Sequence, residues 1–259
     1  MKGICLQAYI PLRTLPSEKS EMCSQLLFGE TFQIIEENNE WISIINDFDK
    51  YKGWCSKKSI NHLSESEYNN ILKSKKIIVP EPFLELKQIN TNKKITISCG
   101  SVIYSLEDNR FRIVDNEYII KKTISDVKNK TIQKKVVELA IKMINTPYLW
   151  GGRSAFGIDC SGLVQTCYRI AGINLPRDAY QQAEYGVHIT KIIKVRKGDL
   201  AFFKNNENKI THVGIMIDKE RIIHSSTNVH IDNIDEKGII NSANGEYSHT
   251  LAFFKRIVI

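Results

Sequence analysis

One cysteine of this chain lies in a local sequence that could activate its thiol. Gly151, Gly152 and Gly157 permit a tight loop, and the apolar residues that follow Cys160 recur at helical spacing. The thiol of Cys160 is therefore expected on the first turn of a helix, in the positive field of unpaired backbone N–H groups. This field should lower the thiol pKa, and the free N–H groups can stabilise an oxyanion. The pattern predicts a nucleophile at Cys160.

Two histidines lie where neighbouring strands could bring them together. His212 opens the apolar run 213–217, and His224 closes the short run 222–223. On adjacent antiparallel strands, His212 could act as the base for Cys160 while His224 orients it. On spacing alone, it is equally possible that both are ordinary histidines at strand ends. The other four histidines lie in polar or loop-like segments, and we assign them no role: His62, His188, His230 and His249.

The elements predicted around these residues form an α+β domain. Apolar residues recur at helical spacing over residues 131–145, and again from Cys160 to the glycine at position 172. Helices followed by an antiparallel sheet are typical of an α+β domain, which we place at residues 130–259. The strands are expected at residues 200–203, 212–217, 221–224 and 251–257.

Short strand-like runs fill the first half of the chain. Residues 32–35 and 41–45 are closely spaced apolar runs separated by a polar turn, as in a small barrel. A second β-rich region covers residues 95–120, after a polar helical stretch. We therefore predict two small all-β barrels, one at residues 1–64 and one, with its linker helix, at residues 65–129.

Composition limits the classes of partner and compartment. The net charge is +7, but the lysines are scattered and no arginine-rich arm or RNA-binding aromatic signature occurs, so nucleic-acid binding is not expected. No Cys-x-x-Cys pair is present, which argues against a zinc site and a dense disulfide framework. The six cysteines lie at positions 5, 23, 55, 99, 160 and 167.

The N-terminal residues do not resemble a signal peptide. Gln7 and Pro11 interrupt the apolar stretch within residues 1–11, and no run in the chain approaches membrane-spanning length. We therefore expect no membrane span, and we favour a cytoplasmic location over a periplasmic or secreted one. We also expect the protein to be a monomer.

Six sequence blocks together resemble the NlpC family of papain-like bacterial cell-wall peptidases. They occur in the family's order between Tyr148 and Ser225, which makes the match far more specific than any single block. The blocks are Tyr148-x-Trp150-Gly151-Gly152, Asp159-Cys160-Ser161-Gly162, Leu175-Pro176-Arg177-Asp178, Gly198-Asp199-Leu200, His212-Val213-Gly214-Ile215 and Ile223-His224-Ser225.

The resemblance implies a role for each of the three residues singled out above. Cys160 would be the nucleophile, His212 the base and His224 the third polar residue, in a papain-like fold. The substrate would be a peptidoglycan stem peptide, L-Ala-γ-D-Glu-diamino acid, cleaved at its γ-D-glutamyl bond. Neither a metal nor a cofactor would be needed.

The N-terminal barrels are similar to the bacterial SH3-like domains that precede the catalytic domain in some members. In one such subgroup the first barrel closes the cleft, and the enzyme requires a free N-terminal L-alanine. Glu21 and Tyr51 best match the residues that face this amine, although a solvated carboxylate and an edge-strand tyrosine are the plain alternative. Residues matching the subgroup's specificity pocket are Tyr148, Asp159, Ser161 and Asp178.

Three functions fit these observations. The chain could cleave small stem peptides for murein recycling, or it could hydrolyse intact wall with its SH3-like domains as anchors. It could also be a non-enzymatic wall-binding protein, but the presence of Cys160, His212 and His224 argues against that. An amidase or acyltransferase on the same fold fits less well, because the Arg177-Asp178 block matches the peptidases.

Overall fold

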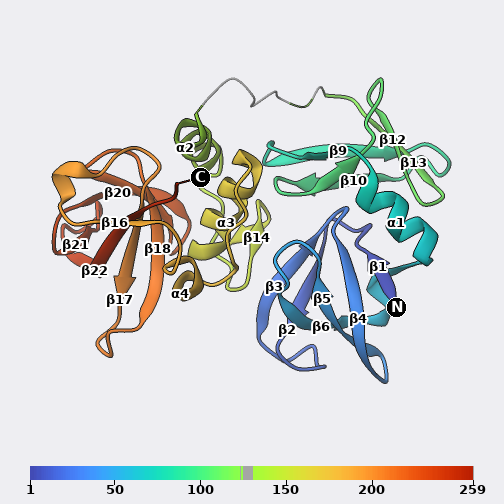
Figure 1. The fold of residues 1–259 in the computed structure, drawn as a ribbon, viewed down its shortest axis with the longest axis horizontal. Helices are drawn as coiled ribbons and strands as arrows, with labels where there is room; N and C mark the ends of the chain where they lie inside the picture. The colour runs from blue at the N-terminus through green and yellow to red at the C-terminus, as the bar shows by residue number, and fades with distance from the viewer. Residues whose placement is uncertain (123, 125–130, 259) are drawn as a thin grey trace. The chain divides into compact units, whose positions relative to one another are not determined.

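The computed structural model describes residues 1–122, 124 and 131–258 (Figure 1). The chain forms two compact units. One comprises Met1–Asp126 together with Trp150–Ala155, and the other comprises Val127–Leu149 and Phe156–Ile259. Among the described residues, no helix has the length and apolar character needed to cross a bilayer.

The first unit begins with a seven-stranded antiparallel sheet in the order β3-β2-β6-β5-β4-β1-β7. Alternate residues of its strands point inward, so that Ile10 and Leu12 are buried while Pro11 between them is not. Irregular register at Ile34–Glu36 bends β4, which helps a short sheet to curl. The strands are β1 (Lys2–Ile4), β2 (Tyr9–Arg13), β3 (Met22–Leu27), β4 (Thr31–Asn38), β5 (Trp41–Asn46), β6 (Lys52–Ser56) and β7 (Asn61–Leu63).

A helix and two small sheets complete the chain up to residue 120. Ser64 and Glu67 form a capping box at the start of α1. Strands pair in the orders β10-β9-β13-β12 and β11-β8. The elements are α1 (Glu65–Lys73), β8 (Lys76–Ile78), β9 (Phe83–Gln88), β10 (Lys94–Ser98), β11 (Val102–Tyr104), β12 (Arg110–Ile113) and β13 (Asn116–Ile120).

These small sheets share a hydrophobic core with the first sheet. The ring of Phe28 packs edge-on against Phe111 and Tyr118, with centroids 6.3 and 5.5 Å away. The backbone N–H of Val102 donates to the Phe28 carbonyl at 2.8 Å. One core cluster therefore joins Ile4 and Phe28 to the second β-rich region, while a separate cluster that includes Leu26, Phe32 and Ile44 fills the first sheet.

The segment Trp150–Ala155 belongs to the first unit, although the sequence places it within the predicted domain of residues 130–259. Arg153, in β14 (Arg153–Ser154), is fully buried and forms a two-pronged ion pair with buried Glu30, at 3.1 and 3.2 Å. The same guanidinium donates to the Gln25 carbonyl at 2.8 Å. A buried charge needs such partners, so the pair determines where this segment lies.

Close backbone approaches surround this ion pair. Gly151 has φ +76°, and a Cβ there would lie only 2.4 Å from the carbonyl oxygen of Met22. The Ala155 N–H donates to the Ser98 hydroxyl at 2.7 Å. Glycine at position 151 is thus required both by its φ and by the space available.

The second unit has helices followed by a closed antiparallel sheet, in the order that the sequence predicts. Its strand order is β16-β22-β17-β18-β19-β20-β21, and β21 also pairs with β22, which closes six strands into a ring. The helices are α2 (Ile132–Lys142), α3 (Cys160–Ala171) and α4 (Ala179–Gln182). The strands are β15 (Gly157–Ile158), β16 (Val187–Ile189), β17 (Leu200–Lys204), β18 (Ile210–Met216), β19 (Arg221–Ser225), β20 (Val229–Ile234), β21 (Gly238–Ile240) and β22 (Tyr247–Arg256).

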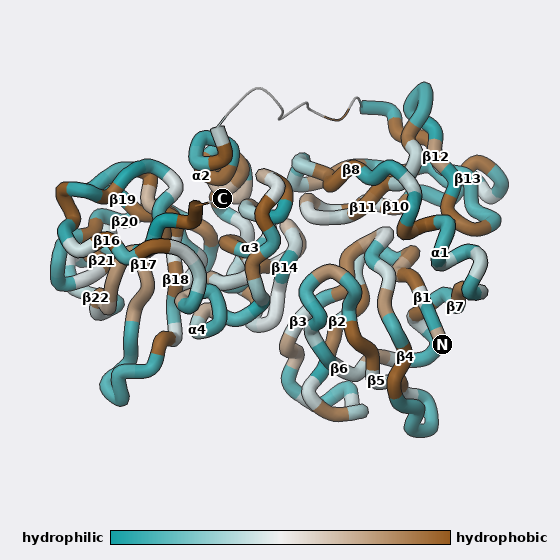
Figure 2. The backbone as a smooth tube through the Cα atoms, in the orientation of Figure 1, coloured by the Kyte–Doolittle hydropathy of each residue, from teal (hydrophilic) through white to brown (hydrophobic). Residues whose placement is uncertain are grey.

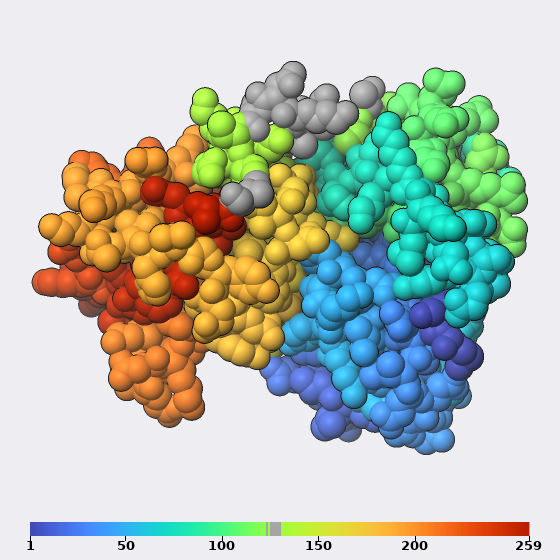
Figure 3. Space-filling view, viewed as in Figure 1, coloured from blue at the N-terminus to red at the C-terminus, as the bar shows by residue number. Residues whose placement is uncertain are grey.

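Helix α3 is buried along its whole length against this sheet. It ends at Gly172, whose left-handed conformation (φ 102°) allows the chain to turn away. The apolar stretches of the sheet appear brown in Figure 2, whereas the turn between β17 and β18 is teal. This β17–β18 hairpin projects from the second unit (Figure 3).

The buried ion pair leads to a stability prediction. Glu30→Ala leaves the Arg153 charge buried without its carboxylate, which should lower the free energy of unfolding by about 3–5 kcal/mol. Urea denaturation followed by tryptophan fluorescence measures this change.

Glu18 provides a matched control, because it forms an ion pair with Arg13 but its side chain is 73% exposed. Glu18→Ala should lower the free energy of unfolding by at most about 1 kcal/mol. Equal losses in the two variants would show that the buried pair does not hold the segment.

Candidate active site

Cys160 is the first residue of α3, and its thiol faces the strand that carries His212. The preceding residue, Asp159, caps the helix by accepting a hydrogen bond from the Gly162 N–H at 2.7 Å. The backbone N–H groups of Ser161 and Val213 both point toward the thiol. Val213 directly follows His212 in β18, so the thiol lies against the part of the strand that carries His212.

The thiol is held in its neutral form, contrary to the sequence-based expectation. Burial, and after it the Asp159 carboxylate, raise the pKa of Cys160 to about 12, against the lowering effect of the Val213 N–H and of Arg177. Burial likewise lowers the pKa of His212 well below its ordinary value. The resting pair is therefore a thiol and a neutral imidazole, so a proton must leave sulfur as it attacks.

His212 and His224 form a direct hydrogen bond. His212 Nε2 lies 2.9 Å from His224 Nδ1, and the two rings are nearly perpendicular at 88°. Both imidazoles are buried, and burial lowers the pKa of His224 as well. Gly214 leaves room for the neighbouring strand, since a Cβ there would lie 2.6 Å from Ile222 Cδ1 and 3.0 Å from the Cβ of His224.

A buried carboxylate completes the line of hydrogen bonds. Asp232 Oδ2 lies 3.2 Å from His224 Nε2, and its other oxygen accepts from the Ser242 N–H at 2.9 Å. Burial alone would raise the pKa of Asp232, but these hydrogen bonds hold it well below its ordinary value. Asp232 is thus an anion and can only accept.

The anion determines which nitrogens of the histidines carry protons. Asp232 requires a proton on His224 Nε2, which leaves Nδ1 of the same neutral ring as an acceptor. His212 must then donate from Nε2, and its Nδ1 is left with a free lone pair. This is the nitrogen that a general base needs toward Cys160.

Strand register explains why Asp232 is there. In the β19–β20 pairing, His224 lies directly opposite His230. Residues two apart on a strand point to one face, so Asp232 joins His230 on the face of His224. The sequence analysis missed Asp232 and gave His230 no role, although the alternation His230-x-Asp232 after a candidate histidine is visible in the sequence.

His249 also lies within this cluster, again without a role assigned from the sequence. Its ring stacks on His212 with centroids 4.1 Å apart. Burial, followed by the neighbouring His224, lowers the pKa of His249 to about 4. It comes from β22, far away in the sequence, which is why spacing gave no signal.

Two of the predicted pocket residues are engaged in a buried network. Arg177 donates to both oxygens of Asp159, at 3.0 and 2.5 Å, and to the Ser161 hydroxyl at 2.8 Å. Ser161 in turn donates to Asp159 at 3.2 Å. The Asp159 and Ser161 side chains therefore hold the start of α3 in place beside Cys160.

The other two predicted pocket residues of this unit lie nearby in the fold. The Tyr148 N–H donates to the Thr227 carbonyl at 3.0 Å, and burial, then the adjacent Cys160, raises the pKa of its phenol to about 12. Asp178 is the N-cap of α4 and forms a capping box with Gln181.

Glu21 and Tyr51 lie in the first unit. The Glu21 carboxylate is exposed and accepts from the indole N–H of Trp150 at 2.5 Å. Tyr51 is half-buried, and its backbone N–H donates to Asp49 at 3.1 Å. Trp150 follows Tyr148 by two residues in the sequence.

Comparisons with known proteins agree with this architecture. Residues 145–247 match the NlpC/P60 family, and residues 12–60 match the bacterial dipeptidyl-peptidase SH3 domain. Dipeptidyl-peptidase 6 of Lysinibacillus sphaericus is 25% identical, covering 92% of this chain and 93% of that protein. Gamma-D-glutamyl-L-lysine dipeptidyl-peptidase of Bacillus subtilis is 29% identical, covering 78% of this chain and 71% of that protein. A crystal structure of an NlpC/P60 family protein from Bacillus cereus has a TM-score of 0.83 at 20% identity, with 99% of each chain covered, which shows the same fold.

The geometry predicts that Cys160 and His212 are both indispensable. Cys160→Ala and His212→Ala should each lower the turnover of a γ-D-glutamyl peptide by roughly a thousandfold or more, because the nucleophile or its base is lost. Cys167→Ala is the matched control, since Cys167 is buried on the same helix but lies outside the cluster, and it should keep its turnover. Substantial turnover by purified Cys160→Ala would exclude this mechanism.

Asp232 should act as a positioning residue through His224. An asparagine oxygen can still accept from His224 Nε2, but the charge assistance of about 1.5–3 kcal/mol is lost. Asp232→Asn should therefore lower kcat by roughly ten- to a hundredfold while KM changes little. Asp235→Asn, a substitution at an aspartate hydrogen-bonded to Tyr247, serves as the control. A change confined to KM would contradict a positioning role.

Proposed function

Since residues 145–247 are an NlpC/P60 domain and residues 12–60 are a bacterial dipeptidyl-peptidase SH3 domain, we propose that this protein is a cysteine peptidase of peptidoglycan stem peptides. It hydrolyses the γ-D-glutamyl bond to a diamino acid. The observation that carries this proposal is the hydrogen-bonded line Asp232–His224–His212, together with the Cys160 thiol that lies against the next residue of the same strand, Val213.

The chemistry follows from the protonation states of the site. Sulfur of Cys160 attacks the γ-carbonyl carbon of D-glutamate while its proton moves to Nδ1 of His212. The oxyanion is stabilised by the N–H groups at the start of α3. The protonated His212 then donates to the departing amine, the γ-C–N bond breaks, and a thioester remains.

Water completes the cycle at the same histidine. His212 removes a proton from water as the oxygen attacks the thioester carbonyl. The C–S bond then breaks, the D-glutamyl γ-carboxylate leaves, and the proton returns from His212 to the Cys160 sulfur. Asp232 and His224 stabilise the imidazolium form of His212 in both halves of the reaction, because that charge lies at the end of a line anchored on a carboxylate. Every proton in this sequence passes through one nitrogen, Nδ1 of His212.

The substrate class rests on the relatives. Two of them are named for dipeptidyl-peptidase activity, one at γ-D-glutamyl-L-lysine bonds. A dipeptidyl-peptidase of this kind would release L-Ala-γ-D-Glu from a short stem peptide whose amine is free. The match of residues 12–60 to the bacterial dipeptidyl-peptidase SH3 domain supports the same subgroup.

We further propose that Glu21 selects for that free amine. Its exposed carboxylate, oriented by the Trp150 indole, offers a negative charge for an ammonium group. A charge-assisted hydrogen bond contributes about 1.5–3 kcal/mol, or about ten- to a hundredfold in preference. The stem alanine of intact wall is amide-linked to muramic acid and would be disfavoured.

The region of residues 65–129 is proposed to be a diverged second SH3-like module. Its described part is short antiparallel strands, as expected for such a module. Its core includes Ile4, Phe28 and Leu63 of the first module, so its role would be to support that module and not to act as an independent wall anchor.

The substrate proposal is tested with two versions of one tripeptide. N-acetylation of L-Ala-γ-D-Glu-L-Lys should lower kcat/KM by about tenfold or more, since the ammonium charge is lost. Glu21→Gln should reduce the difference in kcat/KM between the free and the acetylated peptide. Glu18→Gln is the control, because Glu18 is an exposed carboxylate in the same β2–β3 connection.

The outcomes separate the two main functions. Cleavage of the free peptide with little activity on purified sacculi supports a recycling peptidase. If acetylated peptide or sacculi are cleaved as fast as the free tripeptide, the enzyme is a hydrolase of intact wall.

A further inference from the structure

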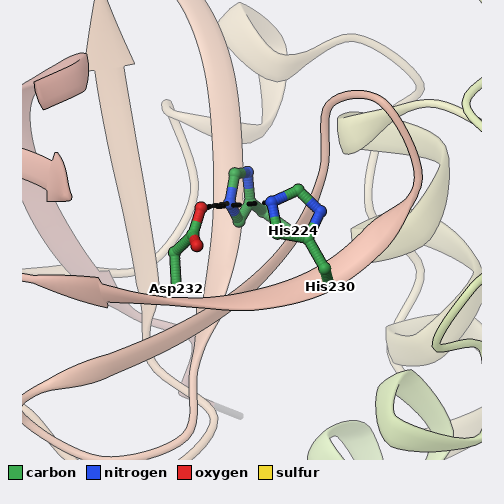
Figure 4. A group of neighbouring side chains, drawn as sticks. All are labelled: His224, His230 and Asp232. Carbon is green, nitrogen blue, oxygen red and sulfur yellow. Dashed lines mark hydrogen bonds and ion pairs between the residues drawn. The ribbon is translucent and has the colours of Figure 1, made fainter. Parts of the chain in front are cut away.

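His224, His230 and Asp232 bring three ligand atoms into a space suited to a metal ion (Figure 4). One atom from each side chain lies within 4.8 Å of the other two. We propose that this cluster binds a divalent transition metal, with zinc as the best fit, and that the bound ion switches the peptidase off. The inhibitory consequence rests on the proposed function, whereas the binding site itself does not.

The distances suit a tetrahedral ion. In such a site, ligand atoms about 2.0–2.1 Å from zinc lie about 3.3 Å from one another. Asp232 Oδ2 lies 3.2 Å from His224 Nε2 and 3.1 Å from His230 Nε2. The two histidine nitrogens lie within 4.8 Å of each other, so the three ligands can close on one ion by a small side-chain movement, and a fourth position remains for water.

The outer partners of these ligands are also in place. His230 Nδ1 lies 2.9 Å from the Asn228 carbonyl, which can only accept, so Nδ1 carries a proton. The other nitrogen, Nε2, faces the Asp232 carboxylate at 3.1 Å, and a bound ion would take the place of the proton between them. The second oxygen of Asp232 is held by the Ser242 N–H at 2.9 Å. Metal-binding histidines and carboxylates are usually oriented by such hydrogen bonds.

The donor set favours zinc over calcium or magnesium. Two imidazole nitrogens and one carboxylate oxygen suit first-row transition metals, whereas calcium and magnesium prefer oxygen ligands alone. The Asp232 anion offsets part of the ionic charge. The His230 side chain is 26% exposed, while those of His224 and Asp232 are 1% and 2% exposed, so His230 gives solvent access to the site.

An ion at this position would change which ring nitrogens of His224 and His212 carry protons. When the metal takes the lone pair of His224 Nε2, the proton of that neutral ring resides on Nδ1. His224 then donates to His212 Nε2, 2.9 Å away, and neutral His212 carries its own proton on Nδ1. That nitrogen can no longer accept the Cys160 proton. The metal would therefore inhibit without contacting the thiol.

Direct binding is measured on Cys160→Ala, which removes thiol coordination. We expect one Zn²⁺ per chain by isothermal titration calorimetry after dialysis against chelator. Asp232→Asn and His230→Ala, each in the Cys160→Ala background, should weaken binding by about tenfold or more, as loss of a ligand does in metal sites. His230→Gln provides a second variant of similar size, and His62→Ala, at an exposed histidine of β7, is the control.

Cobalt distinguishes this site from the thiol in the protein with Cys160 intact. Co²⁺ bound by His224, His230 and Asp232 gives visible ligand-field bands without a sulfur-to-cobalt charge-transfer band. Addition of Zn²⁺ should remove these bands. A strong charge-transfer band that disappears in Cys160→Ala would place the ion on the nucleophile and overturn the proposal.

Inhibition is measured for each variant as the ratio of its activity with and without Zn²⁺. His230→Ala should need about tenfold more Zn²⁺ for half-inhibition than the wild type, because the ion loses one of three ligands. Equal inhibition of both proteins, or Zn²⁺ binding no tighter in Cys160→Ala than in its His230→Ala derivative, would overturn the proposal. If the protein proves inactive on every stem peptide, the binding experiments still decide the metal site.

Discussion

The pairing of β19 with β20 is the constraint on which the site depends. It places His224 opposite His230, and the two-residue period of a strand brings Asp232 to the same face. A slip of one residue would move His230 and Asp232 to the other face, and the hydrogen-bonded line to His212 would lose its anion. Closure of the ring by β21 and β22 opposes such a slip, because both neighbours of β20 are then fixed by further strands. The hydrogen-bonded line from Asp232 to His212 thus depends on backbone register more than on side-chain packing.

Buried ion pairs fix the two segments that flank the nucleophile in the sequence. Arg153 and Glu30 hold the glycine-containing loop in the first unit, and Arg177 and Asp159 hold the start of α3 in the second. A buried pair gives little net stability compared with apolar residues, but breaking it is costly, so it specifies one arrangement of the chain. Residues that the family resemblance assigned to substrate binding, such as Asp159, therefore also have a structural task. A substitution there would change the position of Cys160 as well as any contact with substrate.

Local patterns in the sequence predicted the local features of the fold. The helix that begins at Cys160, the strand that carries His212 and the order of helices before sheet all follow from apolar periodicity, which each segment contains in itself. Contacts between distant segments could not be predicted in this way. His249 stacks on His212 from a strand 37 residues later, and the core around Phe28 joins two regions that composition separated. The same limit explains why Asp232 was missed, since its relation to His224 exists only once the register is known.

Two physical effects on the Cys160 thiol oppose each other: the field at the start of α3 and burial of the side chain. The field at a helix start favours an anion by about 0.3–1 kcal/mol, and by about 2 kcal/mol in partly buried sites. Burial, with a smaller effect of the Asp159 carboxylate, instead raises the thiol pKa from 9.0 to about 12, which corresponds to roughly 4 kcal/mol against the thiolate. Burial is the larger effect, so the helix field moderates the shift without reversing it. A neutral resting thiol reacts slowly with oxidants and stray electrophiles, and the thiolate forms only when His212 takes its proton. Nucleophilicity is then controlled by the protonation of one imidazole nitrogen, which makes the hydrogen-bonded line to Asp232 the determinant of when Cys160 can react.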